Sequence, residues 1–118
     1  MAENIVNLNP IFRGDSREYN LAFTDALDAV INISTWTIYF TVKKNYGDAD
    51  AAALISKDIT VHYDGANGKT KITLLPADTD IPPKNYFYDI QAKKAVDDIT
   101  TVLAGRVEIR SDVTRRIT

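Results

Sequence analysis

Residues 34–44, STWTIYFTVKK, alternate between apolar and polar side chains. The apolar positions are Trp36, Ile38, Phe40 and Val42, and the intervening positions are Thr35, Thr37, Tyr39, Thr41 and Lys43. Successive side chains of a strand point to opposite faces, so a period of two indicates a strand with one face in a core. The many aromatic and β-branched residues favour the same structure.

The same period recurs along the chain. We predict further strands at residues 18–23, 58–63, 69–75, 86–95 and 99–110, and an extended segment at residues 4–12. Residues 64–68, DGANG, supply the glycine and asparagine that hairpin connections need, so we predict a hairpin over residues 58–75. Gly105 interrupts the last strand and predicts a bulge or a close backbone approach there.

About seven strands separated by turn signals, without a long amphipathic helix, predict an all-β protein. The spacing favours an immunoglobulin-like antiparallel β-sandwich of about seven strands. We predict one domain over residues 1–118, with an extended N-terminal arm (residues 1–10) and a C-terminal tail (residues 111–118). The lone Trp36 in the third strand suits this fold.

Residues 77–90, ADTDIPPKNYFYDI, add a second sign of the sandwich. Adjacent prolines exclude a central strand at residues 82–83, and we expect one helical turn near residues 77–80. Tyr86 then begins the penultimate long strand, as in a tyrosine corner, in which the hydroxyl bonds to the backbone upstream. Tyr88 takes the place of the second cysteine of disulfide-bonded domains, so we expect aromatic packing in place of that disulfide.

Composition excludes several classes of function. The net charge of -2 and the pI of about 5.3 argue against nucleic acid as a partner. The chain has no cysteine, which excludes disulfides, thiolate zinc sites and cysteine nucleophiles. The first ten residues lack the features of a signal peptide, and no apolar run approaches the roughly 20 residues of a membrane helix, so we expect no membrane partner.

No catalytic, cofactor or metal site emerges from the residues, and we predict that the protein is not an enzyme. The only histidine, His62, alternates with Val61 and Tyr63, so we expect it on the solvent side. Two oxygen-rich loops suit turns better than calcium; they contain Asp48 with Asp50 and Asp64 with Asn67. Asp97 and Asp98 are neighbours at a turn, which does not place two carboxylates across a cleft.

A candidate interface is the face opposite the predicted core. Tyr39 and Phe87 both belong to it, and they form an exposed aromatic patch if their strands are neighbours in one sheet. The alternative is that an adjacent loop covers them. Arg115 and Arg116, near the C-terminus, are further candidate interface residues.

Five motifs together resemble a known family. They are IFRGDSREYNLAF (11–23), STWTIYFTVKK (34–44), GKTKITLLPADTD (68–80), NYFYDIQAK (85–93) and TTVLAGRVEIRSDVTR (100–115). In order and spacing, across residues 8–116, they resemble the immunoglobulin-like N-terminal domain of phage baseplate upper proteins and related tail or head-fibre structural proteins.

The resemblance implies a structural virion protein of a tailed bacteriophage, assembled in the cytoplasm of the bacterial host. It would be an attachment or adaptor module in a baseplate, tail, head decoration or fibre base. Its partners would be other virion structural proteins, within a homo-oligomer or other symmetric assembly, and it carries no catalytic residues or cofactor. The alternative hypothesis is a carbohydrate-binding β-sandwich whose site is formed by Tyr39, Phe87 and the acidic loops.

The tripeptide Arg13-Gly14-Asp15 matches an integrin-binding signal. Its position between two extended segments favours a turn instead, because glycine adopts backbone angles that other residues resist and aspartate bonds to nearby backbone. We therefore expect a positive φ angle at Gly14.

Overall fold

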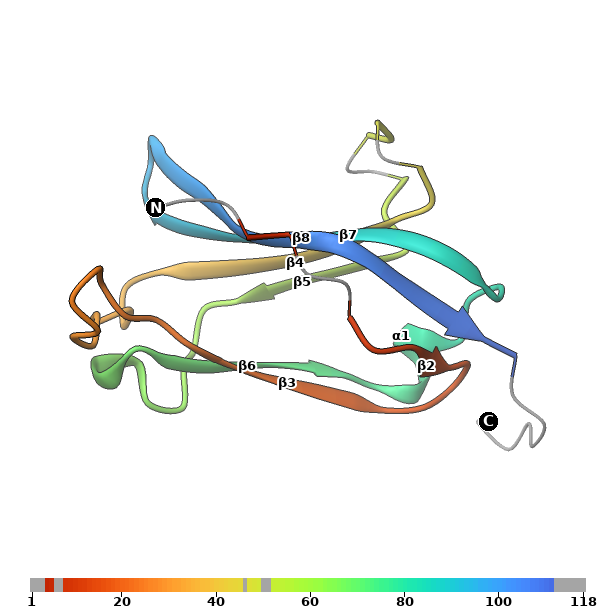
Figure 1. Ribbon diagram of the computed structural model, residues 1–118, viewed down its shortest axis with the longest axis horizontal. Coiled ribbons are helices and arrows are strands. Elements are labelled where there is room, and N and C mark those ends of the chain that lie inside the picture. The colour runs from red at the N-terminus through yellow and green to blue at the C-terminus, as the bar shows by residue number, and fades with distance from the viewer. Residues whose placement is uncertain (1–3, 6–7, 46, 50–51, 112–118) are drawn as a thin grey trace.

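The computed structural model describes residues 4–5, 8–45, 47–49 and 52–111 and arranges them in two β layers (Figure 1). The strands are β1 (Asn4–Ile5), β2 (Ile11–Phe12), β3 (Arg17–Ala22), β4 (Thr37–Lys43), β5 (Ile55–Ile59), β6 (Lys69–Leu74), β7 (Lys84–Ala95) and β8 (Asp98–Arg110). One helical turn, α1 (Pro76–Thr79), follows β6 close to its predicted position. These elements confirm that the protein is all-β.

The larger layer, called the large sheet below, has the strand order β1-β8-β7-β4-β5, with β2 also paired to β8. The small sheet contains β3 and β6, which pair antiparallel. Both β1 and β2 run parallel to β8, so the large sheet is mixed, and the prediction of a purely antiparallel structure is wrong there. No tight turn joins the N-terminal segment to the last strand, so nothing local forces antiparallel pairing.

The core lies between the two sheets, and the predicted alternation is confirmed at its centre. The inward residues of β4, β6 and β7 are all buried: Ile38, Phe40, Val42, Thr70, Ile72, Leu74, Tyr86, Tyr88, Ile90 and Ala92. Trp36, just before β4, is buried with them. The Phe40 ring lies 6.0 Å from the ring of Tyr88 and 6.2 Å from that of Tyr19 in β3. Aromatic contacts therefore join the two sheets, as expected for a chain without cysteine.

The predicted hairpin over residues 58–75 is wrong. β5 pairs with β4 in the large sheet, whereas β6 pairs with β3 in the small sheet, and residues 60–68 cross between them. Val61 and Tyr63 are consequently 84% and 57% exposed rather than inward. Residues 65–67 do form a 3₁₀ turn, and Asp64 pairs with Lys69, so the chain turns at the predicted place although β5 and β6 do not pair. Alternation and turn residues do not specify which strand a segment pairs with.

The pairing of β7 with β8 is irregular at two places, neither of them at Gly105, so the bulge predicted there is wrong. The register shifts between Ile90 and Gln91, which pair with Leu103 and Thr101 and leave Val102 as the extra residue. Gly105 stays in register opposite Tyr88. The bulge therefore lies three residues before the predicted glycine.

The predicted tyrosine corner is confirmed at its defining contact. The Tyr86 hydroxyl donates a hydrogen bond to the carbonyl oxygen of Pro82, and the side chain is only 1% exposed. Burial raises the pKa of Tyr86 above its usual value, so the hydroxyl keeps the proton that this bond requires. The bond fixes the corner from which β7 begins.

Replacing Tyr86 with phenylalanine is expected to lower the free energy of unfolding by about 1 to 2 kcal/mol, because it removes that bond and little else. Tyr19→Phe is the matched control. In the unsubstituted protein the Tyr19 hydroxyl is buried and has no hydrogen-bond partner among the described residues. Removing it should therefore leave the free energy of unfolding unchanged or slightly higher. Urea unfolding measures both; equal effects of the two substitutions would contradict the role of the corner.

The Arg-Gly-Asp tripeptide forms a turn against α1. Gly14 is buried with φ of 84°, as expected, and its N–H donates to the carbonyl oxygen of Thr79 at 3.3 Å. The Arg13 Nε lies 2.8 Å from Asp80 Oδ1, and the Thr79 hydroxyl donates to the Asp15 carbonyl oxygen at 2.7 Å. The tripeptide therefore has a structural role, which is to hold the turn between β2 and β3 against α1.

Gly14→Ala is expected to lower the free energy of unfolding by about 1 to 2 kcal/mol, the usual cost of placing a Cβ in the left-handed region. Gly47→Ala is the control, because Gly47 is exposed and, apart from its chain neighbours, no atom of the described residues lies within 4 Å of an added Cβ. Thermal unfolding measures the stability lost in each variant. A Gly14→Ala protein as stable as the Gly47→Ala protein would refute the strain argument.

Candidate interaction face of the large sheet

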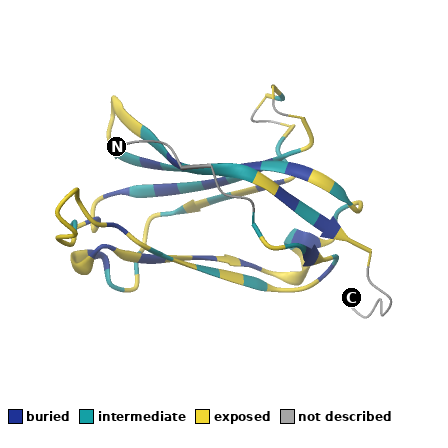
Figure 2. Cartoon of the chain, viewed as in Figure 1, coloured by how far each residue is buried: buried dark blue, intermediate teal, exposed yellow. Residues whose placement is uncertain are grey.

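The outer face of the large sheet is a polar surface that several strands build together. Alternation that buries one set of residues sends the intervening set outward. Register aligns these outward residues in rows: Ser56, Thr41, Asp89 and Ala104 form one row, and Asp58, Tyr39, Gln91 and Thr101 form the next. Figure 2 shows partly exposed positions alternating with buried ones along these strands. We call this surface the outer face.

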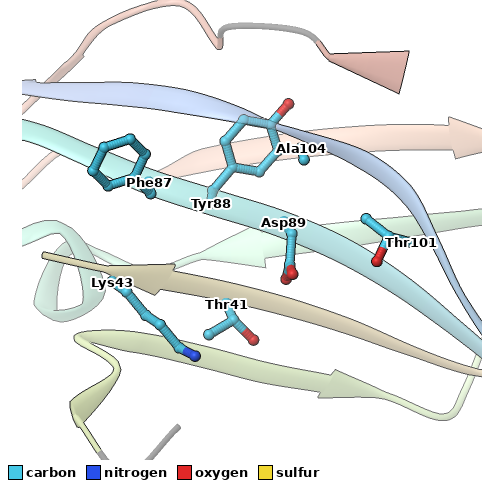
Figure 3. A pocket seen from close by; sticks show the side chains of 7 residues that line it. All are labelled: Thr41, Lys43, Phe87, Tyr88, Asp89, Thr101 and Ala104. Atoms are coloured by element: carbon cyan, nitrogen blue, oxygen red, sulfur yellow. The ribbon is translucent and has the colours of Figure 1, made fainter. Parts of the chain in front are cut away.

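Two adjoining depressions lie on the outer face. The first is lined by Thr41, Lys43, Phe87, Tyr88, Asp89, Thr101 and Ala104 (Figure 3). The second is lined by Tyr39, Thr41, Lys43, Ser56, Asp58, Asp89, Gln91 and Ile99. Thr41, Lys43 and Asp89 belong to both, so the depressions make one continuous polar track across β5, β4, β7 and β8.

The two predicted aromatic residues flank this track without touching each other. β4 and β7 are neighbours, but Tyr39 lies opposite Gln91 and Phe87 lies opposite Lys43. The pair of Thr41 and Asp89 therefore separates them. Both rings are half-buried, and the guanidinium of Arg106 lies 5.4 Å from the centre of the Phe87 ring. The outer face therefore presents two separate aromatic side chains rather than the single aromatic patch that was predicted.

The electrostatics of the outer face are nearly balanced. Lys43 and Arg106 supply positive charge, and Asp58 and Asp89 supply negative charge. The Lys43 ammonium donates to the carbonyl oxygen of Asp48 at 2.9 Å, which ties the loop after β4 to the track. Tyr88 contributes no charge to this face, because its side chain points inward, where burial and the nearby Tyr19 raise the pKa of its hydroxyl. The face offers hydrogen bonds and mixed charge to a partner.

His62 is not on the solvent side, so that prediction is wrong. Its Nε2 lies 2.8 Å from the carbonyl oxygen of Trp36, and its Nδ1 lies 2.7 Å from the Thr70 hydroxyl. The contact to a carbonyl requires a proton on Nε2. Because residues 60–68 cross between sheets instead of forming a strand, the alternation with Val61 and Tyr63 does not apply. No local signal in the sequence indicates this bridge.

The other predicted residues lie as follows. Asp48 accepts a hydrogen bond from the Asn45 N–H, and Asp64 accepts from the Asn67 amide, which is turn chemistry in both loops. Asp97 lies in the turn between β7 and β8, and Asp98 begins β8; both are exposed. Asp50, Arg115 and Arg116 lie outside the described residues.

Within the described ranges, no group of three His, Asp or Glu side chains is placed to hold a metal ion. The described part of the chain also has no helix long and apolar enough to cross a membrane. No protein-family model matches the chain, and a search of curated proteins finds no significant match.

Proposed function

We propose that this chain is a structural virion protein of a tailed bacteriophage, an immunoglobulin-like attachment module that docks other virion proteins. The proposal joins three separate observations. They are the family resemblance of the five motifs, the connections of the strands, and the character of the outer face.

The strand connections support the immunoglobulin-like part of the proposal. In that fold, strand B pairs with E in one sheet, and strands C, F and G are neighbours in the other. Here β3 pairs with β6, while β4, β7 and β8 are neighbours in that order, with β5 beside β4 in the place of strand C′. The tyrosine corner at Tyr86 lies at the beginning of the strand equivalent to F, where the fold has it.

The strand arrangement differs from the immunoglobulin fold in two respects. The first strands pair with β8 rather than with β3, and residues 60–68 cross between sheets without a strand equivalent to D. The small sheet is consequently reduced to two strands. These departures change the edges of the sheets and leave their pairing at the centre intact.

The single observation that carries a docking function is the outer face. It spans four strands of the large sheet, has balanced charge, and presents half-buried Tyr39 and Phe87 beside a polar track. Aromatic residues next to hydrogen-bonding groups are typical of protein interfaces. The lining extends over four strands and is partly open to solvent, which suits a protein surface better than an enclosed small molecule.

Mass spectrometry and immunogold microscopy of purified particles test the proposal. We expect the protein in a fixed, symmetric copy number at one position on the virion. A Tyr39→Ala copy should be incorporated less than wild type, whereas Val96→Ala, at an exposed position in the turn between β7 and β8, should be incorporated normally. Absence of the protein from purified particles would refute the virion assignment.

A carbohydrate-binding function is the second candidate, and the lining of the first depression favours it. Thr41, Asp89 and Thr101 provide hydrogen-bonding oxygens in the same depression that the Phe87 ring lines, a combination that suits a sugar. The Arg106 guanidinium over that ring is the feature that opposes stacking. A glycan array read with wild type and Asp89→Ala decides this candidate: binding lost in the variant supports it, and an array without hits removes it.

A further inference from the structure

The edges of the two sheets differ in how they are protected. At one side of the large sheet, β8 is covered by β1 and β2, and the Leu8 N–H donates to the carbonyl oxygen of Arg106 at 2.9 Å. At the other side, Lys57 lies at the middle of β5 and points inward, with its Nζ 2.8 Å from Asp78 Oδ2. An inward charge guards an edge because a pairing strand would have to bury it.

The β6 edge of the small sheet is partly occupied. The Lys69 N–H donates to the Asp64 carbonyl oxygen at 3.0 Å, and the Asp64 N–H donates to the Lys69 carbonyl oxygen at 3.3 Å. His62 contacts the Thr70 hydroxyl, and the Lys71 ammonium lies 5.7 Å from the Tyr63 ring centre. Residues 62–64 therefore lie against the first half of β6.

The β3 edge has no such cover in the described part of the chain. The Phe23 N–H donates to the Gly68 carbonyl oxygen at 2.8 Å, one position beyond the last pair of the β3-β6 ladder. Because backbone groups alternate in direction along an antiparallel strand, the even-numbered residues face away from β6. These are Glu18, Asn20 and Ala22, and no backbone hydrogen bond from outside the β3-β6 pair involves them among the described residues.

β3 also lacks the devices that normally protect an edge. It contains no proline and no bulge, and its central inward residues, Tyr19 and Leu21, are uncharged. Its one inward cation, Arg17, lies at the end of the strand, where Nη2 donates to the Pro10 carbonyl oxygen at 3.2 Å. A six-residue strand of this kind is ready to accept another strand.

We propose that two copies of this chain pair antiparallel through their β3 edges, centred on Asn20, so that the two small sheets become one sheet of four strands. In this register Asn20 lies opposite itself, and Glu18 of one copy lies opposite Ala22 of the other. Glu18, Asn20 and Ala22 of each copy then each donate one backbone hydrogen bond to the other copy and accept one from it. Tyr19 of one copy lies opposite Leu21 of the other on the inward face, so apolar groups meet there.

The distribution of charge favours pairing of two copies through β3 over pairing through β6. In the β3 register no like charges lie opposite each other. The corresponding register at β6 would centre on Lys71 and place two lysines directly opposite, which is unfavourable. The pairing goes beyond the proposed function and does not depend on it, because a chain absent from virions can still dimerise, and a chain found in virions can be monomeric.

Light scattering on the full chain tests the pairing. We expect wild type to have twice the 13.1 kDa mass of one chain at micromolar concentration. Asn20→Lys places two positive charges at the centre of the interface and should raise the dissociation constant at least about tenfold. Thr73→Lys adds the same charge to the exposed face of β6 and should leave the dimer intact. Circular dichroism verifies that both variants are folded.

Two results would overturn the pairing: a wild-type mass of one chain at all concentrations measured, or equal dissociation constants for Asn20→Lys and Thr73→Lys. A cysteine variant then tests the register in a chain that has no native cysteine. Residues opposite each other in a hydrogen-bonded antiparallel pair have Cα atoms about 5.5 Å apart, which suits a disulfide. Asn20→Cys should form a disulfide-linked dimer under mild oxidation, and Lys71→Cys should not; equal cross-linking would place the interface elsewhere.

Discussion

Gly68→Ala is expected to lower the free energy of unfolding by about 3 kcal/mol or more. Gly68 has φ of 76°, where an L-residue costs about 1 to 2 kcal/mol. An added Cβ would also lie 2.6 Å from the Phe23 carbonyl oxygen and 2.7 Å from that of Ile31. Both oxygens belong to backbone, so relief requires moving the chain, which adds a cost of about 1 to 3 kcal/mol.

Gly68→Asn separates the two causes. Asparagine tolerates the left-handed region better than alanine but carries the same Cβ. If close contact dominates, both variants lose stability to a similar degree in urea unfolding. A Gly68→Asn protein as stable as wild type would show that the backbone angle alone matters and that the contact argument is wrong.

His62→Ala is expected to lower the free energy of unfolding by about 2 to 3 kcal/mol. The imidazole bridges the Trp36 carbonyl oxygen, just before β4, and the Thr70 hydroxyl in β6. Thr70 is fully buried, so its hydroxyl would lose a partner that water cannot easily replace. The ring is thus a polar connection between the large and small sheets.

A double-mutant cycle with Thr70→Val isolates this bridge. The valine removes the partner hydroxyl, so the double variant should be more stable than the sum of the two single effects predicts, by about 1 kcal/mol. Val61→Ala serves as the control, since this neighbouring side chain is 84% exposed and should have almost no effect. Strict additivity, or a loss with Val61→Ala as large as with His62→Ala, would count against the bridge.

The outer face was partly predictable. Alternation in residues 34–44 correctly assigned Tyr39 to the face opposite the core, and the same reasoning assigned Phe87. The relative placement of these residues could not be predicted, because it depends on the register between β4 and β7. That register sets Thr41 and Asp89 between them and thereby creates the polar track.

The contrast between β6 and His62 shows where local patterns stop being informative. Thr70, Ile72 and Leu74 alternate within a real strand, and all three are buried as expected. His62 alternates equally well with its neighbours, yet it lies in a segment that crosses between sheets. Both segments carry the same pattern, and only pairing with β3 distinguishes the first from the second.

Local properties of the chain were therefore sufficient for the strands at the centre of the core, the tyrosine corner at Tyr86 and the positive φ angle at Gly14. Each depends on side-chain period or backbone conformation within a few residues. The tertiary structure alone decided that β5 and β6 belong to different sheets, that β1 and β2 run parallel to β8, and that β3 keeps an open edge. Strand pairing joins residues distant in sequence, and an alternating pattern specifies which face is buried but not which strand lies beside it.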